Sequence, residues 1–291
     1  MRALPPSDRV LSALRLLRPG NLVVSFVGTV VGGLVARGAG VSAPGVFWLF
    51  VVLAATSTAL VTAGGNALND LLDLEGDRTN HPDRPLVTGE VSVRGAKALT
   101  AALFVVGVLV VVPVVLAIPL VGLILAIAVG SLLLYEFRFK AEGFAGNLTV
   151  ALLTGLVFLY GGAVGGRIEL VAAFAGMAFL ATLSREVIKD MEDMEGDVER
   201  RTLPRVRGIP LSSQVARISV GVALAASAIP LLLFVTWTSV AGIMYLILVG
   251  AADAIFVVSV RYLPERLHYE QTMSKVAMTV ALFAFLAVAF R

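Results

Sequence analysis

The chain contains no cysteine and only two histidines among its 291 residues, and only 15% of its residues carry a charge. The absence of thiols excludes disulfide bonds, thiolate metal sites and a cysteine nucleophile. The low charge accompanies 58% hydrophobic residues and a mean hydropathy of +0.93. A soluble domain of this length cannot hide so much apolar surface, and exposed apolar surface promotes aggregation. The composition therefore indicates a membrane protein.

Apolar runs of transmembrane length follow one another along the chain, and hydropathy predicts nine of them. A helix of about 20 residues crosses a bilayer, and backbone groups in lipid must be hydrogen-bonded within their own segment. The runs are continuous rather than alternating, which disfavours a β-barrel. The predicted fold class is all-α, a polytopic membrane protein with nine transmembrane helices in one bundle, forming a single domain over residues 1–291. The predicted spans are 20–36, 46–66, 96–115, 118–135, 146–166, 170–188, 214–236, 240–260 and 272–290.

Lysine and arginine lie almost entirely on one side of this topology. Of the 23 basic residues, all but Arg37, Arg167 and Arg291 fall on the side of the N-terminus. By the positive-inside rule, the N-terminus is cytoplasmic and the C-terminus is external, in a multi-pass protein of the cell membrane. The net charge of +3 therefore reflects membrane orientation and does not indicate nucleic-acid binding. Residues 1–19 are predicted to form a basic arm along the cytoplasmic interface; an ordinary basic flank that only sets the membrane orientation is an equal alternative.

Two acidic motifs share the spacing Asp-x2-Asp-x3-Asp, each at the end of a predicted span. Their residues are Asp70, Asp73 and Asp77 in the first copy and Asp190, Asp193 and Asp197 in the second. On a helix each set would face one way, into the bundle and away from lipid. Converging carboxylates repel one another unless cations lie between them, and Mg²⁺ prefers one or two carboxylates together with phosphate oxygens and water. The six aspartates are therefore predicted metal ligands, with neutral oxygen ligands from Asn66 and Asn69.

The predicted active-site connections are 67–95 and 189–213, which are cytoplasmic, charged and dotted with glycine and proline. Basic side chains on this side suit a diphosphate, because arginine makes bidentate phosphate contacts and lysine supplies a point charge. The candidate diphosphate-binding residues are Lys189, Arg185, Arg78, Arg84, Tyr135, Arg138 and Lys140. For any single basic residue, membrane orientation alone is an adequate explanation.

These residues resemble the UbiA superfamily of intramembrane prenyltransferases. The resemblance covers nearly the whole chain and includes the nine spans, the motif N-D-x2-D-x3-D at 69–77, the segment 78–92 and the second acidic motif. It implies that both motifs bind Mg²⁺ and a prenyl diphosphate. The implied catalytic residues are Asn69, Asp73, Asp77, Asp190, Asp193 and Asp197. Tyr135 and Lys140 match the family's tyrosine and basic connection in kind.

Within the superfamily, the segments 185–197 and 201–204 are most similar to archaeal-type digeranylgeranylglyceryl phosphate synthases. The similarity implies transfer of a geranylgeranyl group from its diphosphate to the hydroxyl of geranylgeranylglyceryl phosphate, in ether membrane lipid synthesis. Two alternatives remain open, namely an aromatic acceptor of the quinone or chlorophyll pathways and a divalent-cation transporter. A transporter should carry acids near the bilayer midplane on several helices, and here only Asp253 does. No obligatory protein partner is expected.

Overall fold

Helices account for all the regular structure of the described chain. The computed structural model describes residues 6–38, 45–195 and 200–291, and these ranges contain no β-strand. The elements are α1 (Pro6–Leu17), α2 (Pro19–Arg37), α3 (Gly45–Leu72), α4 (Leu74–Asn80), α5 (Val93–Leu109), α6 (Val112–Ala117), α7 (Pro119–Phe137), η1 (Phe139–Ala141), α8 (Phe144–Gly165), η2 (Ile168–Leu170), α9 (Ala172–Glu192), η3 (Asp193–Glu195), α10 (Leu203–Arg207), α11 (Ile209–Ala226), α12 (Ile229–Leu233), α13 (Val240–Arg261) and α14 (Leu267–Val288), where η marks a 3₁₀ helix. The predicted all-α class is confirmed.

Eight segments of the described chain are helical, long and apolar enough to cross a membrane. They match eight of the predicted spans; α5 with α6 forms one segment (Val93–Ala117), and α11 with α12 forms another (Ile209–Leu233). The remaining predicted span, 170–188, is present as α9, but charged residues that include Arg185 and Glu186 occupy its last turns. A multi-pass helical membrane protein is therefore confirmed, whereas the count of nine transmembrane helices is not.

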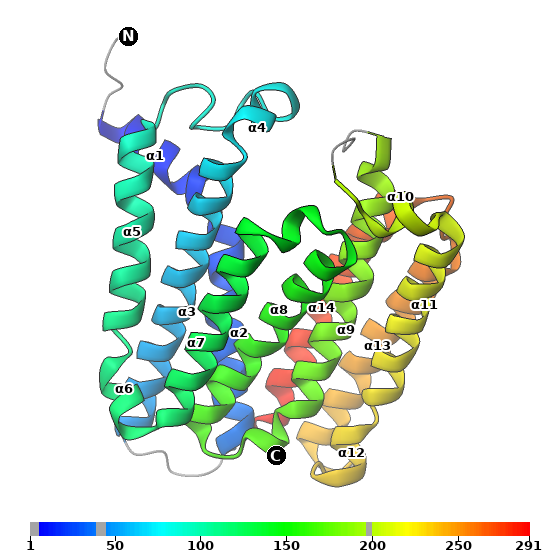
Figure 1. Cartoon of the computed structure of the whole chain (residues 1–291). Helices are drawn as coiled ribbons and strands as arrows, with labels where there is room; N and C mark the ends of the chain where they lie inside the picture. Colours follow the sequence, from blue (N-terminus) through cyan, green and yellow to red (C-terminus); the bar gives the residue numbers. More distant parts are fainter. Residues whose placement is uncertain (1–5, 39–44, 196–199) are drawn as a thin grey trace.

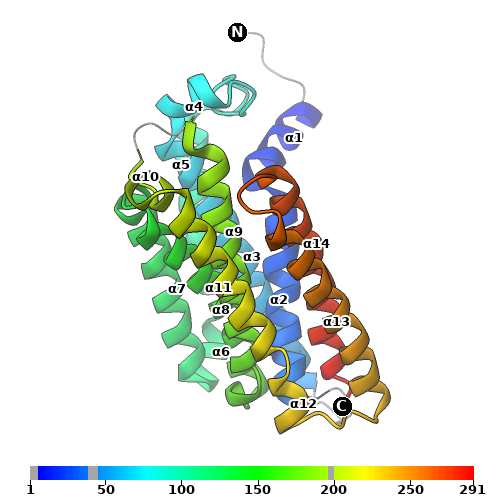
Figure 2. The same cartoon turned by 90° about the vertical axis from the view of Figure 1, so that its right-hand side faces the viewer.

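The long helices run side by side in one bundle, with short helices at its ends (Figures 1 and 2). α8 packs against α2, α7 and α9 and has the largest buried share of the eight segments, 56% against 17% for α7. α1, α4 and α10 gather at one end of the bundle, whereas α14 runs to the opposite end (Figure 1). The start of α1 and the last residue of the chain therefore lie at opposite ends.

The close contact between α2 and α8 depends on glycine. A Cβ atom added at Gly161 would lie 1.9 Å from the carbonyl oxygen of Thr29, and one added at Gly32 would lie 2.2 Å from that of Phe158. Small residues allow helix backbones to approach in this way in membranes, where van der Waals packing rather than the hydrophobic effect holds helices together. In the sequence, the first acidic motif lies between these two helices and the second follows α8.

The largest apolar core lies between α2, α8, α9, α13 and α14. Phe174, which is 1% exposed, makes edge-to-face contacts with Phe285 and Tyr245, at ring-centroid distances of 4.7 and 6.3 Å. Such aromatic pairs add stability beyond the area that they bury. The acidic motifs are not part of this core, since they occupy the ends of α3 and α9.

Candidate active site

The first acidic motif crosses the break between α3 and α4. α3 ends at Leu72, Asp73 forms a bend, and α4 begins at Leu74. Backbone hydrogen bonds continue across the break, from the Asp73 N–H to the Asn69 carbonyl (3.0 Å) and from the Asp77 N–H to the Asp73 carbonyl (2.8 Å). The motif keeps nearly helical spacing but does not lie on one uninterrupted helix.

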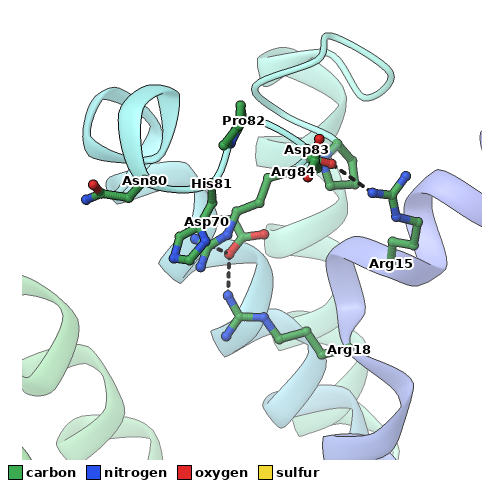
Figure 3. A pocket seen from close by; sticks show the side chains of 9 residues that line it. Arg15, Arg18, Asp70, Asn80, His81, Pro82, Asp83 and Arg84 are labelled. Carbon is green, nitrogen blue, oxygen red and sulfur yellow. Dashed lines mark hydrogen bonds and ion pairs between the residues drawn. The ribbon is translucent and has the colours of Figure 1, made fainter. Parts of the chain in front are cut away.

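Two aspartates of this motif are buried and share one arginine. Asp70 and Asp77 are 3% and 5% exposed. Arg84 Nη1 pairs with Asp77 Oδ2 and lies 3.2 Å from Asp70 Oδ1. Arg18 Nη2 lies 2.5 Å from the same Asp70 oxygen, and Figure 3 shows both guanidinium groups directed at this carboxylate. Since a buried charge without a partner is costly, the two arginines supply the countercharge that these acids need.

The third aspartate of the first motif belongs to a separate network. Lys140 Nζ lies 2.5 Å from Asp73 Oδ2 and 3.3 Å from Glu136 Oε2. Asn69 Nδ2 donates to Glu136 Oε1 at 3.1 Å, so Glu136 links α3 to α7 and to the connection that follows α7. Glu136 was not among the metal-ligating or diphosphate-binding residues predicted from the sequence. Its position could have indicated a role in the site, because it is an acid at the end of an apolar span and precedes Lys140 by four residues.

The second motif also crosses the end of a helix. α9 ends at Glu192 and η3 begins at Asp193, while Asp197 lies outside the described residues. Asn147 Nδ2, on α8, donates to Asp190 Oδ2 at 2.8 Å. Burial raises the pKa of Asp190, which lies beyond the apolar part of α9, to about 6, although the Asn147 hydrogen bond acts in the opposite direction. Asp193 is exposed.

Three of the predicted diphosphate-binding arginines are paired within their own segments. The pairs are Arg185–Glu186 (2.6 Å), Arg78–Glu75 (3.4 Å) and Arg138–Glu142 (3.2 Å). Arg78, Arg138 and Lys189 are exposed. Asn66 Nδ2, from the predicted metal-ligand set, donates to the backbone carbonyl of Leu17 at 2.8 Å and so attaches the end of α1 to α3. The assignment of these residues to substrate or metal stays a prediction.

Tyr135, near the end of α7, has charged residues of both motif regions nearby. It interacts electrostatically with Asp73 of the first motif and with Glu186, which precedes Asp190 by about one helical turn. Arg200 interacts in the same way with both Tyr135 and Asp190. The end of α7 therefore lies near both acidic regions.

A glycine allows the α7–α8 connection to contact the segment after the second motif. Gly143 has a φ of 61°, and a Cβ atom at this position would lie 1.9 Å from the carbonyl oxygen of Arg201. The Arg201 N–H donates to the Ala141 carbonyl at 3.4 Å. Only glycine combines this left-handed backbone with so close an approach, so residue 143 helps to hold the two sides of the site together.

The donor atoms of both motifs suit a hard divalent cation. Mg²⁺ keeps several waters and is commonly held by one or two carboxylates together with substrate phosphates. Within the described ranges, no three His, Cys, Asp or Glu side chains form a ready-made metal site. This agrees with the pairing of Asp70, Asp73 and Asp77 with arginine and lysine. Each of these ion pairs involves one oxygen of the carboxylate, so a metal at the same oxygen would compete with the basic side chain that contacts it.

Fold and site together define a multi-pass helical membrane protein with acidic motifs at the ends of two helices. Residues 25–289 match the UbiA prenyltransferase family. The chain belongs to this family, as its sequence motifs predicted, and it is therefore a prenyltransferase by family.

Comparisons with individual proteins agree with this assignment. The chain is 37% identical over 246 residues to the digeranylgeranylglyceryl phosphate synthase of Methanoculleus marisnigri, an alignment that covers 83% of this chain and 82% of the relative. A solved structure of a digeranylgeranylglyceryl phosphate synthase has a TM-score of 0.78 at 30% identity and covers 97% of this chain and 99% of its own. A UbiA homologue from Archaeoglobus fulgidus, solved with GPP and Mg²⁺, has a TM-score of 0.68 at 21% identity, covers 96% of this chain and 98% of its own, and supports the fold alone.

Proposed function

We propose that the chain transfers a geranylgeranyl group from its diphosphate to the hydroxyl of geranylgeranylglyceryl phosphate, with Mg²⁺ as cofactor. The observation that carries the proposal is 37% identity over 83% of the chain to a digeranylgeranylglyceryl phosphate synthase. The product in that name is a glyceryl phosphate with two geranylgeranyl groups, so the acceptor is a glyceryl phosphate with one. The two acidic motifs of this chain supply the residue types that the donor diphosphate requires.

The metal site proposed for this reaction uses oxygen ligands from both motifs. They are Asn69, Asp70, Asp73, Asp77, Asp190, Asp193 and Asp197, with Asn66 as a further candidate. Bound Mg²⁺ would stabilise the negative charge that develops on the departing diphosphate. The Archaeoglobus fulgidus homologue that shares this fold was solved with GPP and Mg²⁺, and Mg²⁺ is the cofactor proposed here.

Lys140 and Arg84 are proposed to exchange a carboxylate partner for a diphosphate oxygen when the donor binds. Lys140 now contacts Asp73, and Arg84 contacts Asp70 and Asp77. An ammonium group supplies a point charge to the diphosphate, and a guanidinium group supplies parallel N–H donors. Both would stabilise the leaving group as negative charge accumulates on it.

Bond exchange takes place at the allylic carbon of the donor. The C–O bond to the diphosphate breaks, and its electron pair stays with the diphosphate. The acceptor hydroxyl oxygen forms the new ether bond, and its proton passes to a motif carboxylate or to the released diphosphate. Exclusion of water by the surrounding helices protects the electron-deficient prenyl group from hydrolysis. A strong general base is not required, because the allylic carbon is already highly electrophilic.

The site is proposed to face the cytoplasm. α1, α4 and α10, which carry many of the basic residues of the chain, share one end of the bundle (Figure 1). Basic residues near membrane spans remain on the cytoplasmic side. A prenyl donor from the cytosol would reach the acidic motifs from this end, and the C-terminus would be external.

An acceptor panel tests the proposal. The purified protein is incubated with Mg²⁺, labelled geranylgeranyl diphosphate and either geranylgeranylglyceryl phosphate or 4-hydroxybenzoate. We expect a labelled lipid with a second ether bond, and no product when a chelator removes the metal. Prenylation of 4-hydroxybenzoate alone would replace the proposed acceptor with an aromatic one. Metal transport into sealed vesicles without prenyl transfer would support the transporter alternative.

A further inference from the structure

A cavity of about 310 Å³ lies beside the first acidic motif, between α1, the end of α3 and the connection that follows α4 (Figure 3). We call it the arginine pocket. Its charged and titratable lining residues are Arg15 of α1, Arg18 at the junction of α1 and α2, Asp70 of α3, and His81, Asp83 and Arg84 of the connection. Asp70 is the only one of the described motif aspartates that lines it. The pocket therefore adjoins the proposed metal site but extends away from it toward α1.

Positive charge predominates in this pocket. Three guanidinium groups share it with two carboxylates, and Asp70, one of the two, is already paired with Arg18 and Arg84. A phosphate monoester carries a charge of about −1.5 to −2 at neutral pH, so it matches such a site better than a neutral or singly charged group does.

Arg15 is the arginine of the pocket that contacts no predicted metal ligand in the interactions described. Its Nη2 donates to the Asp83 carbonyl at 2.7 Å, and its Nη1 lies 3.4 Å from Glu90 Oε2. The backbone carbonyl fixes the guanidinium plane, while the side chain remains 48% exposed. A guanidinium held in this way can present N–H donors to two oxygens of a phosphate.

The proposed reaction requires two phosphate-bearing ligands at the same end of the bundle. The diphosphate of the donor belongs with the metal near Asp73 and Lys140, neither of which lines the arginine pocket. The acceptor carries its phosphate on a three-carbon glycerol, so the reacting hydroxyl cannot lie far from that phosphate. The acceptor phosphate therefore needs a site that adjoins the diphosphate site. The arginine pocket meets this condition, because its lining includes Asp70 of the first motif and Arg84, which contacts that motif, whereas Arg15 lies on the side of α1.

Exposed apolar side chains occur on α2, which begins directly after Arg18 of the pocket. Val23 and Val24, in the second turn after Arg18, are each 61% exposed. Lipid or the hydrocarbon chain of a lipid ligand can cover such side chains in a membrane. An acceptor with its phosphate in the pocket could thus lay its prenyl chain along α2.

We propose that the arginine pocket binds the phosphate monoester of the lipid acceptor, and that Arg15 selects a phosphorylated acceptor over a neutral one. This inference rests on the proposed function, because the acceptor is the one named there. It adds to that function a specificity site outside the two acidic motifs.

Measuring the binding of the lipid acceptor directly tests this inference independently of catalysis. The whole protein in detergent micelles, with neither Mg²⁺ nor donor, is titrated with geranylgeranylglyceryl phosphate and with geranylgeranylglycerol. We expect Arg15→Gln to weaken binding of the phosphorylated lipid about tenfold, the effect of losing a charge-assisted contact, and to leave the neutral lipid unchanged. Arg94→Gln is the matched control, since Arg94 is exposed in the first turn of α5 and does not line the pocket. It should bind both lipids as the wild type does.

A second variant is expected to change affinity in the opposite direction. Glu90 Oε2 accepts a hydrogen bond from Ser12 Oγ at 2.7 Å and places a negative charge beside Arg15. Glu90→Gln keeps an oxygen for the serine and removes that charge, so it should strengthen binding of the phosphorylated lipid about two- to fivefold. Unfolding temperatures of both variants near that of the wild type would exclude a folding defect.

The outcomes separate this inference from the proposed function. An Arg15→Gln variant that binds both lipids normally, or loses both equally, would overturn the assignment of the pocket. Inorganic phosphate that binds as tightly as the phosphorylated lipid would overturn its assignment to the acceptor. If the wild-type protein binds the phosphorylated lipid and this binding depends on Arg15, but no ether product forms, the assignment of the pocket would stand and the proposed reaction would be wrong.

Discussion

Arg18 donates from Nη2 to Asp70 Oδ1 at 2.5 Å, and its own backbone is left-handed, with a φ of 54°. Within the described ranges it is the only residue other than glycine with a positive φ. Such a backbone costs about 1–3 kcal/mol and persists where the surrounding structure imposes it. This conformation, immediately before Pro19, joins α1 to α2 and directs the guanidinium to Asp70 and Asn69, whose oxygens are proposed metal ligands. Arg18 and Arg84 are the two cations that contact the Asp70 carboxylate.

Arg18→Gln removes one guanidinium group that contacts Asp70, so Mg²⁺ should replace it more readily as the countercharge of this carboxylate. We expect the free energy of unfolding without Mg²⁺ to fall by about 1–2 kcal/mol, less than for a fully buried pair because Arg18 is partly exposed and Arg84 still contacts Asp70. Mg²⁺ should bind several-fold more tightly, since its competitor is gone. Thermal unfolding with and without Mg²⁺ and calorimetric Mg²⁺ titration measure the two effects.

Arg18→Gly is the control that separates charge from backbone strain. It removes the same guanidinium but accepts the positive φ, so it should be more stable than Arg18→Gln by about 1 kcal/mol. Its Mg²⁺ affinity should match that of the glutamine variant. Unchanged Mg²⁺ affinity in both variants would show that Arg18 does not compete with the metal.

Asp73→Asn and Asp193→Asn should each lower kcat/KM for prenyl transfer by at least about 100-fold. Each change removes a charged oxygen ligand from one motif, and metal stabilisation of a leaving group contributes several kcal/mol to catalysis. Glu75→Gln, at an exposed position on α4, should retain wild-type activity. Steady-state rates with labelled donor provide the measurement, and near-normal rates in either asparagine variant would remove that motif from the metal site.

The pH dependence of Mg²⁺ binding should follow Asp190. Burial raises the pKa of this carboxyl to about 6 in the metal-free protein, so protons compete with the metal below that pH. Apparent Mg²⁺ affinity should fall as the pH drops from 7 to 5. Asn147→Ala removes a hydrogen bond that favours the ionised form, which raises the pKa further and shifts the fall to higher pH. Calorimetric titrations across this range would reveal the shift; overlapping curves for wild type and Asn147→Ala would contradict it.

Gly161→Ala should destabilise the bundle, because the new methyl group would meet the Thr29 carbonyl oxygen at 1.9 Å. Overpacking of this kind costs about 1–3 kcal/mol, and here the obstacle is backbone, which cannot rotate away. Gly130→Ala is the matched control, since an added Cβ meets no atom within 4 Å there. That change should be neutral or stabilising by about 0.5–1 kcal/mol, as alanine favours a helix interior. Thermal unfolding in detergent distinguishes the two variants.

The sequence predicted the helices well, because hydropathy reports directly on the burial of apolar side chains in lipid. It predicted 170–188 as a span, but the corresponding helix α9 is not among the eight segments, and its apolar part is followed by Arg185 and Glu186 within the same helix. Both acidic motifs were identified, but the helix ends within them were not. Spacing alone does not show where a helix stops at Asp73 or Asp193.

Contacts between segments that are distant in the sequence could not be predicted from the sequence alone. The pairing of Arg18 with Asp70 joins residues 52 positions apart, and Asn69 reaches Glu136 across 67. Both depend on how α1 and α7 pack against α3, which hydropathy does not encode. The basic arm at 1–19 was predicted only as an interfacial segment, whereas its residues Arg15 and Arg18 line a pocket of the site.

The most direct test of the account is the contact between metal and donor at both motifs. Mn²⁺ replaces Mg²⁺ in the presence of an unreactive thio analogue of geranylgeranyl diphosphate, and electron paramagnetic resonance measures the coupling of bound Mn²⁺ to ³¹P. We expect phosphorus coupling in the wild type that is reduced in both Asp73→Asn and Asp190→Asn, because each motif contributes ligands to the same metal–diphosphate complex. Coupling equal to that of the wild type in either variant would show that its motif does not contribute to that complex.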